Sequence, residues 1–202
     1  MSDFVKPSKS HLMTYRIARG EQGVLTYEPY KSYLLPHWRF RTVSIARASS
    51  QTLWQKFLEF YEQNDFVGMD MSRKFIQMGM TRSKRYANYK GGRKYVDGKE
   101  KGEVIEKSKG HEGKEEKEEA SRIFREVWER CKEHEGYQEM KKTFLKEQKE
   151  WLEMEPGRVK EEDDETRSSA RPTSRQSSRR KCQAEEESIK QELSPRLKSE
   201  ND

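Results

Sequence analysis

The distribution of aromatic side chains most limits how this 202-residue chain can fold. Sixteen of its 21 Phe, Trp and Tyr residues precede residue 96, the other five lie between Phe124 and Trp151, and none follows. A segment without rings and with few branched aliphatic residues cannot bury enough apolar surface to offset a backbone ordering entropy of roughly 1–2 kcal/mol per residue. We therefore expect a folded region over 11–154, a flexible amino terminus over 1–10 and a disordered tail over 155–202.

Composition and charge agree with this division. Apolar residues make up 31% of the chain, below the roughly 45–50% typical of globular proteins, and 39% of residues are charged. Residues 1–95 carry a net charge of +10, residues 96–157 carry −4, and residues 158–202 are balanced. The basic excess thus belongs to the amino-terminal part of the folded region.

The sequence predicts extended structure near the amino terminus, over residues 14–18 and 24–30. The segments TYRIA and VLTYEPY are rich in branched and aromatic residues, and Gly20 and Gly23 between them can adopt positive φ. This pattern predicts a β-hairpin that ends near Pro29, because proline is disfavoured in a central strand. Alternation of apolar and basic residues from Trp38 to Arg41 predicts a further extended segment with one side facing inward.

Four helices are predicted beyond this point. Apolar spacing indicates a helix over 44–63, a second that starts near Asp65 and ends before the sequence KGG, a third over 120–131 that Gly136 ends, and a fourth from Tyr137 to the Pro156–Gly157 stop. Residues 97–117 are mostly Gly, Lys and Glu and are expected to form a flexible insertion. The predicted fold class is α+β: a mainly helical single domain with a small amino-terminal hairpin.

Three long motifs carry a resemblance to a known family: RGEQGVLTYEPYKSYLLPHWRFRT, DFVGMDMSRKFIQMG and RYANYKGGRKY. They resemble a family of short basic proteins known only as a domain of unknown function. The resemblance covers about residues 10–95 and 119–152, and this chain differs from it by the insertion and the tail. It implies a shared fold and no activity.

The stretch RSKRYANYKGGRKY holds six basic residues, three tyrosines, two glycines and no acid. Cations near a helix carboxyl terminus offset the helix dipole, but one or two are enough for that. Lys and Arg also bind phosphates, and Tyr rings stack on unpaired bases. The stretch therefore predicts a nucleic-acid-binding surface, mostly sequence-independent and without catalysis; a solvated basic surface with its tyrosines packed inward is the alternative.

The predicted binding residues share positive charge, a ring or a flexible backbone, and Arg39 and Arg41 could extend the same face. They are Arg73, Lys74, Arg82, Lys84, Arg85, Tyr86, Tyr89, Lys90, Gly91, Gly92, Arg93, Lys94 and Tyr95.

Two other classes of function stay open. In the first, the last two helices present Trp128 or Trp151 to a protein partner. In the second, Asp70 or Glu21 converges with arginines in a phosphate-processing pocket. The four histidines and two cysteines show no metal-ligand spacing, and KGGRK lacks the spacing of a phosphate-binding loop, so we expect no cofactor and no metal.

The tail carries regulatory patterns. The sequence IKQELSP resembles an extended acceptor site for the small ubiquitin-like modifier, with Lys190 as acceptor and Ser194 as a proline-directed phosphorylation site, and VKEE repeats the short form at Lys160. A basic run over 175–181 is typical of segments that bind import machinery. Chance matches in a tail rich in Lys, Glu and Ser are the alternative.

Cysteine content and hydropathy bear on the compartment. Two cysteines cannot form a disulfide framework, and the chain has neither a run of about 18 apolar residues nor an apolar signal region at its amino terminus. We expect an intracellular, reducing location, nuclear or nucleo-cytoplasmic, without membrane association.

Overall fold

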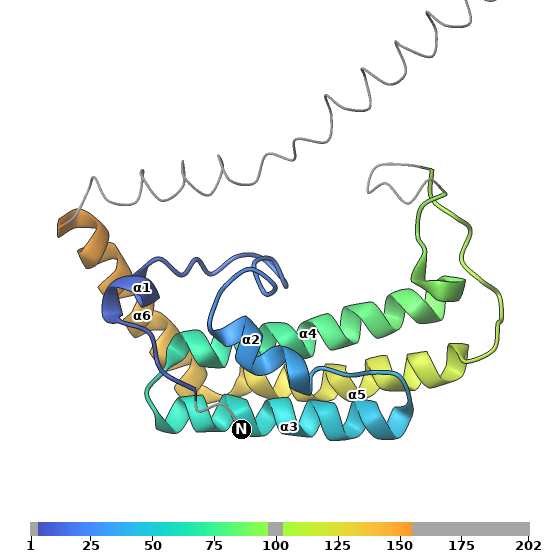
Figure 1. Cartoon of the computed structure of the whole chain (residues 1–202), viewed down its shortest axis with the longest axis horizontal. Coiled ribbons are helices and arrows are strands. Elements are labelled where there is room, and N and C mark those ends of the chain that lie inside the picture. Colours follow the sequence, from blue (N-terminus) through green and yellow to red (C-terminus); the bar gives the residue numbers. More distant parts are fainter. Residues whose placement is uncertain (1–3, 97–102, 155–202) are drawn as a thin grey trace, which may run out of the picture. The chain divides into compact units, whose positions relative to one another are not determined.

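The computed structural model describes residues 4–96 and 103–154, and this part of the chain is helical (Figure 1). Its elements, in chain order, are α1 (Lys9–Met13), α2 (Tyr30–Leu34), the 3₁₀ helix η1 (Leu35–His37), α3 (Val43–Glu62), α4 (Phe66–Asn88), the 3₁₀ helix η2 (Lys90–Gly92), α5 (Lys114–Glu133) and α6 (Glu135–Met154).

The predicted α+β class is wrong, because the described residues contain no strand and only an isolated antiparallel bridge between Tyr95 and Val104. Residues expected to form the hairpin make successive turns, in which the N–H of Gln22 bonds to Arg19 and that of Thr26 bonds to Gly23. Their rings serve the core instead, since Tyr15 is 2% exposed. Strand propensity in such short segments depends on what the side chains pack against, and here they pack against helices.

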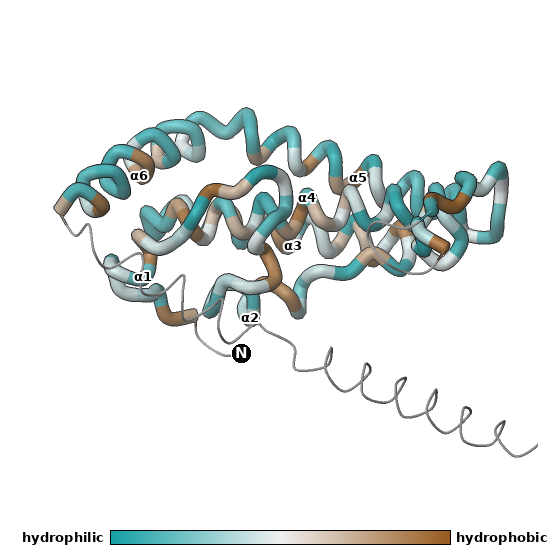
Figure 2. Tube along the Cα trace, turned by 90° about the horizontal axis from the view of Figure 1, so that it is seen from above, coloured by the Kyte–Doolittle hydropathy of each residue, from teal (hydrophilic) through white to brown (hydrophobic). Residues whose placement is uncertain are grey.

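Helices α3, α4 and α5 form the body of the fold and run side by side in Figures 1 and 2. Helix α3 begins at its cap Thr42, whose Oγ1 accepts the N–H of Ile45 at 3.3 Å. Its buried face includes Leu53, Phe57 and Phe60, which follow the helical period. Helix α5 buries Ala120, Ile123, Phe124, Val127 and Cys131 at the same spacing. The helices predicted over 44–63 and 120–131 are confirmed.

Helix α4 lies at the centre, and nearly every residue from Phe66 to Met78 is buried. Asp65 caps it, with Oδ1 accepting the N–H of Gly68 at 3.1 Å, as its position predicts. Close packing explains two glycines: a Cβ at Gly68 would lie 2.3 Å from the Phe60 ring, and one at Gly79 would lie 2.6 Å from the Phe124 ring. Helix α4 is therefore enclosed over its first three turns and becomes exposed to solvent only toward its end.

The break between α5 and α6 lies at His134, whose backbone is extended. Gly136 does not end α5, as its sequence position predicts; it lies in the first turn of α6, where a Cβ would come within 2.2 Å of the Tyr61 ring. Helix α6 buries Tyr137 and Phe144. Near its end, Nε2 of Gln148 donates to the carbonyls of Met13 and Tyr15, which ties the amino-terminal segment to α6.

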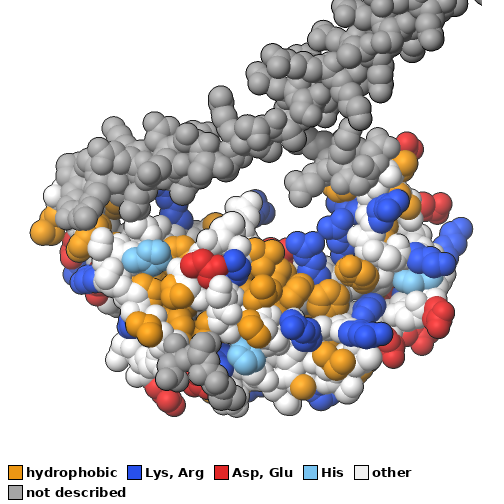
Figure 3. Space-filling view, viewed as in Figure 1, with side chains coloured by type: hydrophobic (Ala, Val, Ile, Leu, Met, Phe, Trp, Pro, Cys, Tyr) orange, Lys and Arg blue, Asp and Glu red, His pale blue; other side chains and the backbone are white. Residues whose placement is uncertain are grey.

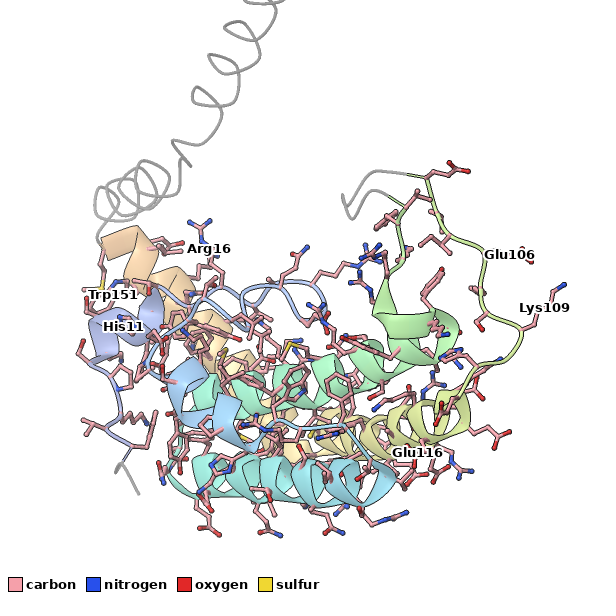
Figure 4. All side chains as sticks on the ribbon, turned by 45° about the vertical axis from the view of Figure 1, so that its right-hand side comes forward. His11, Arg16, Glu106, Lys109, Glu116 and Trp151 are labelled. Carbon is pink, nitrogen blue, oxygen red and sulfur yellow. The ribbon has the colours of Figure 1, made fainter. Side chains whose placement is uncertain are left out.

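The described part of the predicted insertion, residues 103–117, is ordered. Ser108 donates its N–H to the carbonyl of Asn88 at 2.8 Å, and residues 114–117 form the first turn of α5. Glu106 and Lys109 in this loop point away from the helices in Figure 4.

At the amino-terminal end of the described chain, the ring of Phe4 lies 5.0 Å from the Tyr30 ring and 5.2 Å from the Phe60 ring. The chain therefore packs against the core from Phe4 onward.

Candidate nucleic-acid interface

The six basic residues of the RSKRYANYKGGRKY stretch, here called the basic cluster, lie on the last turns of α4 and in the loop after it. They are Arg82, Lys84, Arg85, Lys90, Arg93 and Lys94. Lys90 and Arg93 are exposed, and Arg82 is half-buried. The described residues show one ion pair from this cluster, from Lys84 to Glu118 at 3.7 Å. Lys and Arg side chains gather toward this end of α4 in Figure 3.

The glycine pair has a structural cause. Gly91 and Gly92 have φ of +70° and +71°, a region that L side chains rarely adopt, and a Cβ at Gly92 would lie 2.8 Å from the Tyr86 ring. Nε of Arg85 donates to the Gly92 carbonyl at 2.7 Å. The turn therefore packs its backbone against Tyr86 and fixes that ring. Gly92 and Tyr89 are buried, so their roles here are in packing.

A groove of about 800 Å³ opens beside Tyr86. Trp38, Phe40 and Tyr86 line it with their rings, and Leu35, Pro36 and Ser32 complete one wall. The Phe40 ring centroid lies 5.0 Å from Trp38 and 5.7 Å from Tyr86. We call this hollow the aromatic groove. The ring of Tyr86 is 38% exposed, so a ligand can reach it.

Cations stand around the same groove. Arg39 and Arg41 alternate with Trp38 and Phe40 along an extended segment and are exposed, which confirms the predicted alternation. Nζ of Lys117, from α5, donates to the carbonyls of Phe40 and Arg41 and lies 5.5 Å from the Phe40 ring centroid. Partial burial lowers the pKa of Lys117. Among residues 4–96 and 103–154, no acidic side chain lines the groove.

Two predicted contact residues lie inside the protein. Arg73 is 8% exposed and Lys74 is 1% exposed. Both belong to the enclosed part of α4 and contact Asp70, at 2.8 Å from Nε of Arg73 and 3.6 Å from Nζ of Lys74. Neither residue therefore belongs to the exposed surface of the basic cluster.

Asp70 is the centre of a buried polar network. Tyr15 and Tyr137 donate their hydroxyls to its two carboxylate oxygens at 2.5 and 2.7 Å. Burial opposes ionisation, but Arg73 and Lys74 outweigh it, and the pKa of Asp70 is lowered. Burial, followed by the charge of Asp70, raises the pKa of both tyrosines, so they stay protonated and act as donors. With its oxygens occupied and no exposed surface, this carboxylate serves the fold.

Glu21, the other acid considered for a phosphate-processing pocket, is also engaged. Glu21 accepts a hydrogen bond from the hydroxyl of Thr81 at 2.6 Å. Burial lowers the pKa of His37, and burial raises the pKa of Cys131 to about 12. Over residues 4–96 and 103–154, no group of three or more His, Cys, Asp or Glu side chains is arranged to hold a metal ion.

The tryptophans proposed for protein contact are partly buried. Trp128 packs against the core with Nζ of Lys132 3.9 Å from its ring centroid. Trp151 also packs there, near the end of α6 that Figure 4 shows beside α1. Among the described residues of α5 and α6, the large exposed apolar side chains are Leu145, Leu152 and Met154, none of them aromatic.

The regulatory patterns predicted for the tail lie outside the part of the chain that the structure describes. They comprise Lys160, Lys190 and Ser194, together with the basic run over 175–181. In the described part, no helix is both long and apolar enough to cross a membrane.

Sequence reasoning missed two features of the structure, of which only the first has a signal in the pattern. Asp70 precedes Arg73 and Lys74 by three and four positions, the spacing at which helix side chains meet, and apolar residues surround all three in sequence, which is typical of an enclosed helix. Phe40 and Lys117 are 77 positions apart and carried no shared signal.

Comparison with known proteins gives one result. No curated protein and no solved structure matches the chain. A family profile described as "Domain of unknown function (DUF4385)" matches residues 5–147, most of the described helices. This range includes the aromatic groove, the basic cluster and the Asp70 network. The chain therefore belongs to the DUF4385 family of domains of unknown function.

Proposed function

We propose that this protein binds single-stranded nucleic acid, without catalysis and with little sequence preference, through the aromatic groove and the adjoining basic cluster. One observation carries the proposal: three rings and three cations from separate segments line one groove of about 800 Å³, and none of the described residues that line it is acidic. Single-strand binding proteins combine the same two features, a positive path for phosphates and rings for bases.

Each group has a distinct role in this proposal. An unpaired base stacks on Tyr86 or Phe40, which only a single strand can offer. The exposed Arg39 and Arg41 meet the flanking phosphates, and Arg93 and Lys94 continue the path along the loop after α4. Lys117 donates to the backbone carbonyl of Phe40, and the turn at Gly92 packs against the ring of Tyr86, so both rings are held in place.

The proposal extends to regulation. Phosphate at Ser194 would add roughly 1.5–2 negative charges, and a modifier at Lys190 would add bulk. Both would weaken binding to a polyanion. A nuclear location would give the protein both its ligand and the enzymes that make these modifications.

The first experiment measures fluorescence anisotropy of short labelled single- and double-stranded DNA and RNA with the full-length protein, at about 50–200 mM salt. One variant carries Arg39→Gln, Arg41→Gln, Arg93→Gln and Lys94→Gln. Its matched control removes the same charge from exposed positions outside the groove with Lys9→Gln, Arg125→Gln, Lys146→Gln and Lys149→Gln. We expect the first to lower the log–log salt slope by about 0.7 for each single-strand phosphate that it no longer neutralises, and the control to keep the slope.

A second pair tests the rings. Tyr86→Leu should weaken single-strand binding by about 1–3 kcal/mol for one stacked base, while Tyr86→Phe should keep it because the ring remains. Absence of binding at low salt, equal weakening in variant and control, or a preference for duplex would each refute the proposal in this form.

A further inference from the structure

A second cavity, of about 540 Å³, lies where the beginning of α6 meets the end of α5 and the loop at Ile17 and Ala18. Its lining is strongly basic. The polar groups are Arg73, Lys132, Tyr137, Gln138, Lys141 and Lys142. Leu145 completes the apolar side with Ile17 and Ala18, and the part of the chain that the structure describes places no acidic residue in the lining.

Arg73 makes this cavity a built site, because its side chain is largely buried and fixed. The residue is 8% exposed. Nε donates to Asp70 at 2.8 Å and Nη1 donates to Gln77 at 3.0 Å, so the guanidinium cannot turn away. A planar donor held in this way is suited to phosphate and carboxylate recognition.

The charges behind the cavity do not balance. Asp70 is the one acid of the buried network, while Arg73 and Lys74 are two cations, and the protonated Tyr15 and Tyr137 contribute no charge. Buried charges are usually paired because desolvation is costly. Burial lowers the pKa of Lys74. Burial also opposes the charge of Arg73, but the Asp70 carboxylate outweighs it and raises the pKa of Arg73, so a charged guanidinium lies at the cavity wall.

The lysines at the opening add to this excess. Within the described residues, the ion pairs include none from Lys132, Lys141 or Lys142. Lys132 instead lies over the Trp128 ring, at 3.9 Å from its centroid. Three ammonium groups thus line the same cavity as one fixed guanidinium, a set of charges that favours an anion with two or more negative charges.

We propose that this cavity binds a compact phosphate or pyrophosphate group, either free or as the end of a small organic molecule. The fixed Arg73 guanidinium meets the group at the base, and Lys141 and Lys142 close over it. Ile17, Ala18 and Leu145 contact the organic part. The proposal is independent of the nucleic-acid interface, since the two sites share no residue.

The test is calorimetric titration of the full-length protein with inorganic pyrophosphate, with a nucleoside diphosphate and with sulfate. The variant is Lys141→Gln with Lys142→Gln, and the control is Lys146→Gln with Lys149→Gln, which removes equal charge from the same helix outside the cavity. Arg73 is kept, because its removal would also leave Asp70 without its main partner. Single-strand affinity is measured on both variants.

We expect a saturable site for pyrophosphate, with affinity at least about tenfold lower in the cavity variant and unchanged in the control. If the nucleoside diphosphate binds more tightly than pyrophosphate, the ligand has an organic part. If the two bind equally, the ligand is the inorganic group. The proposal is overturned if sulfate binds as tightly as pyrophosphate, if neither phosphate saturates a site, or if the control is weakened as much as the variant. Nucleic-acid affinity stays unchanged in the cavity variant, which separates failure of one proposal from failure of the other.

Discussion

Replacing Asp70 with asparagine is the sharpest test of the buried network. The change keeps side-chain size and removes one negative charge that is 0% exposed. Arg73 and Lys74 would then be two buried cations without a counter-charge. Removing one partner of a buried ion pair costs about 3–5 kcal/mol. For a folded region of this size, that destabilisation lowers Tm by roughly 6–20 °C.

Asp65→Asn is the matched control, because Asp65 is on the same chain segment and is 1% exposed. Its carboxylate accepts from the Gly68 N–H and from the Tyr30 hydroxyl at 2.6 Å, and no cation pairs with it among the described contacts. Asparagine caps helices nearly as well as aspartate. We therefore expect a cost of about 1 kcal/mol.

The assay is urea unfolding of both variants followed by circular dichroism, with the free energy of unfolding extrapolated to water. Lys74→Met in the Asp70→Asn background should recover part of the stability, since it removes one stranded cation. Equal costs for the two Asn variants would show that the charge of Asp70 does not hold the network, and the reasoning would fail.

Three further predictions concern the core. The pKa of Asp70 is lowered in the folded protein. The stability that ionised Asp70 contributes is therefore complete above the unfolded pKa of about 3.9 and is lost as pH falls through the lower folded pKa. Urea midpoints should decline in that acidic range, and they should decline less in Asp70→Asn. Gly79→Ala should destabilise by about 1–3 kcal/mol through overpacking against Phe124, and a stability gain on thermal unfolding would contradict the close approach. With Cys182 changed to Ser, the native protein should not react with a thiol reagent at pH 8, since burial raises the pKa of Cys131 to about 12; reaction before unfolding would refute its enclosure.

Local signals proved reliable where neighbours in sequence are also neighbours in space. The Asp65 cap and the helical spacing of Leu53, Phe57 and Phe60 predicted α3 and α4 correctly, because capping and helix periodicity act within a few residues. The predicted hairpin is wrong because the rings of Tyr15 and Tyr27 do not belong to strands but pack against Phe144 of α6 and Tyr30 of α2.

The sequence by itself determined α3, α4 and α6, the apolar face of α5, and the concentration of basic charge around the end of α4, whereas it did not predict α1, α2 or the first turn of α5. Only the tertiary structure decided which of those charges reach solvent. Enclosure of α4 by its neighbours moved Arg73 and Lys74 inward, onto Asp70. It also brought Phe40, Tyr86 and Lys117 together at one groove, although they come from three separate segments. The physical reason is that helix formation is governed by contacts within a turn, whereas burial and site assembly depend on which faces pack together across the whole fold.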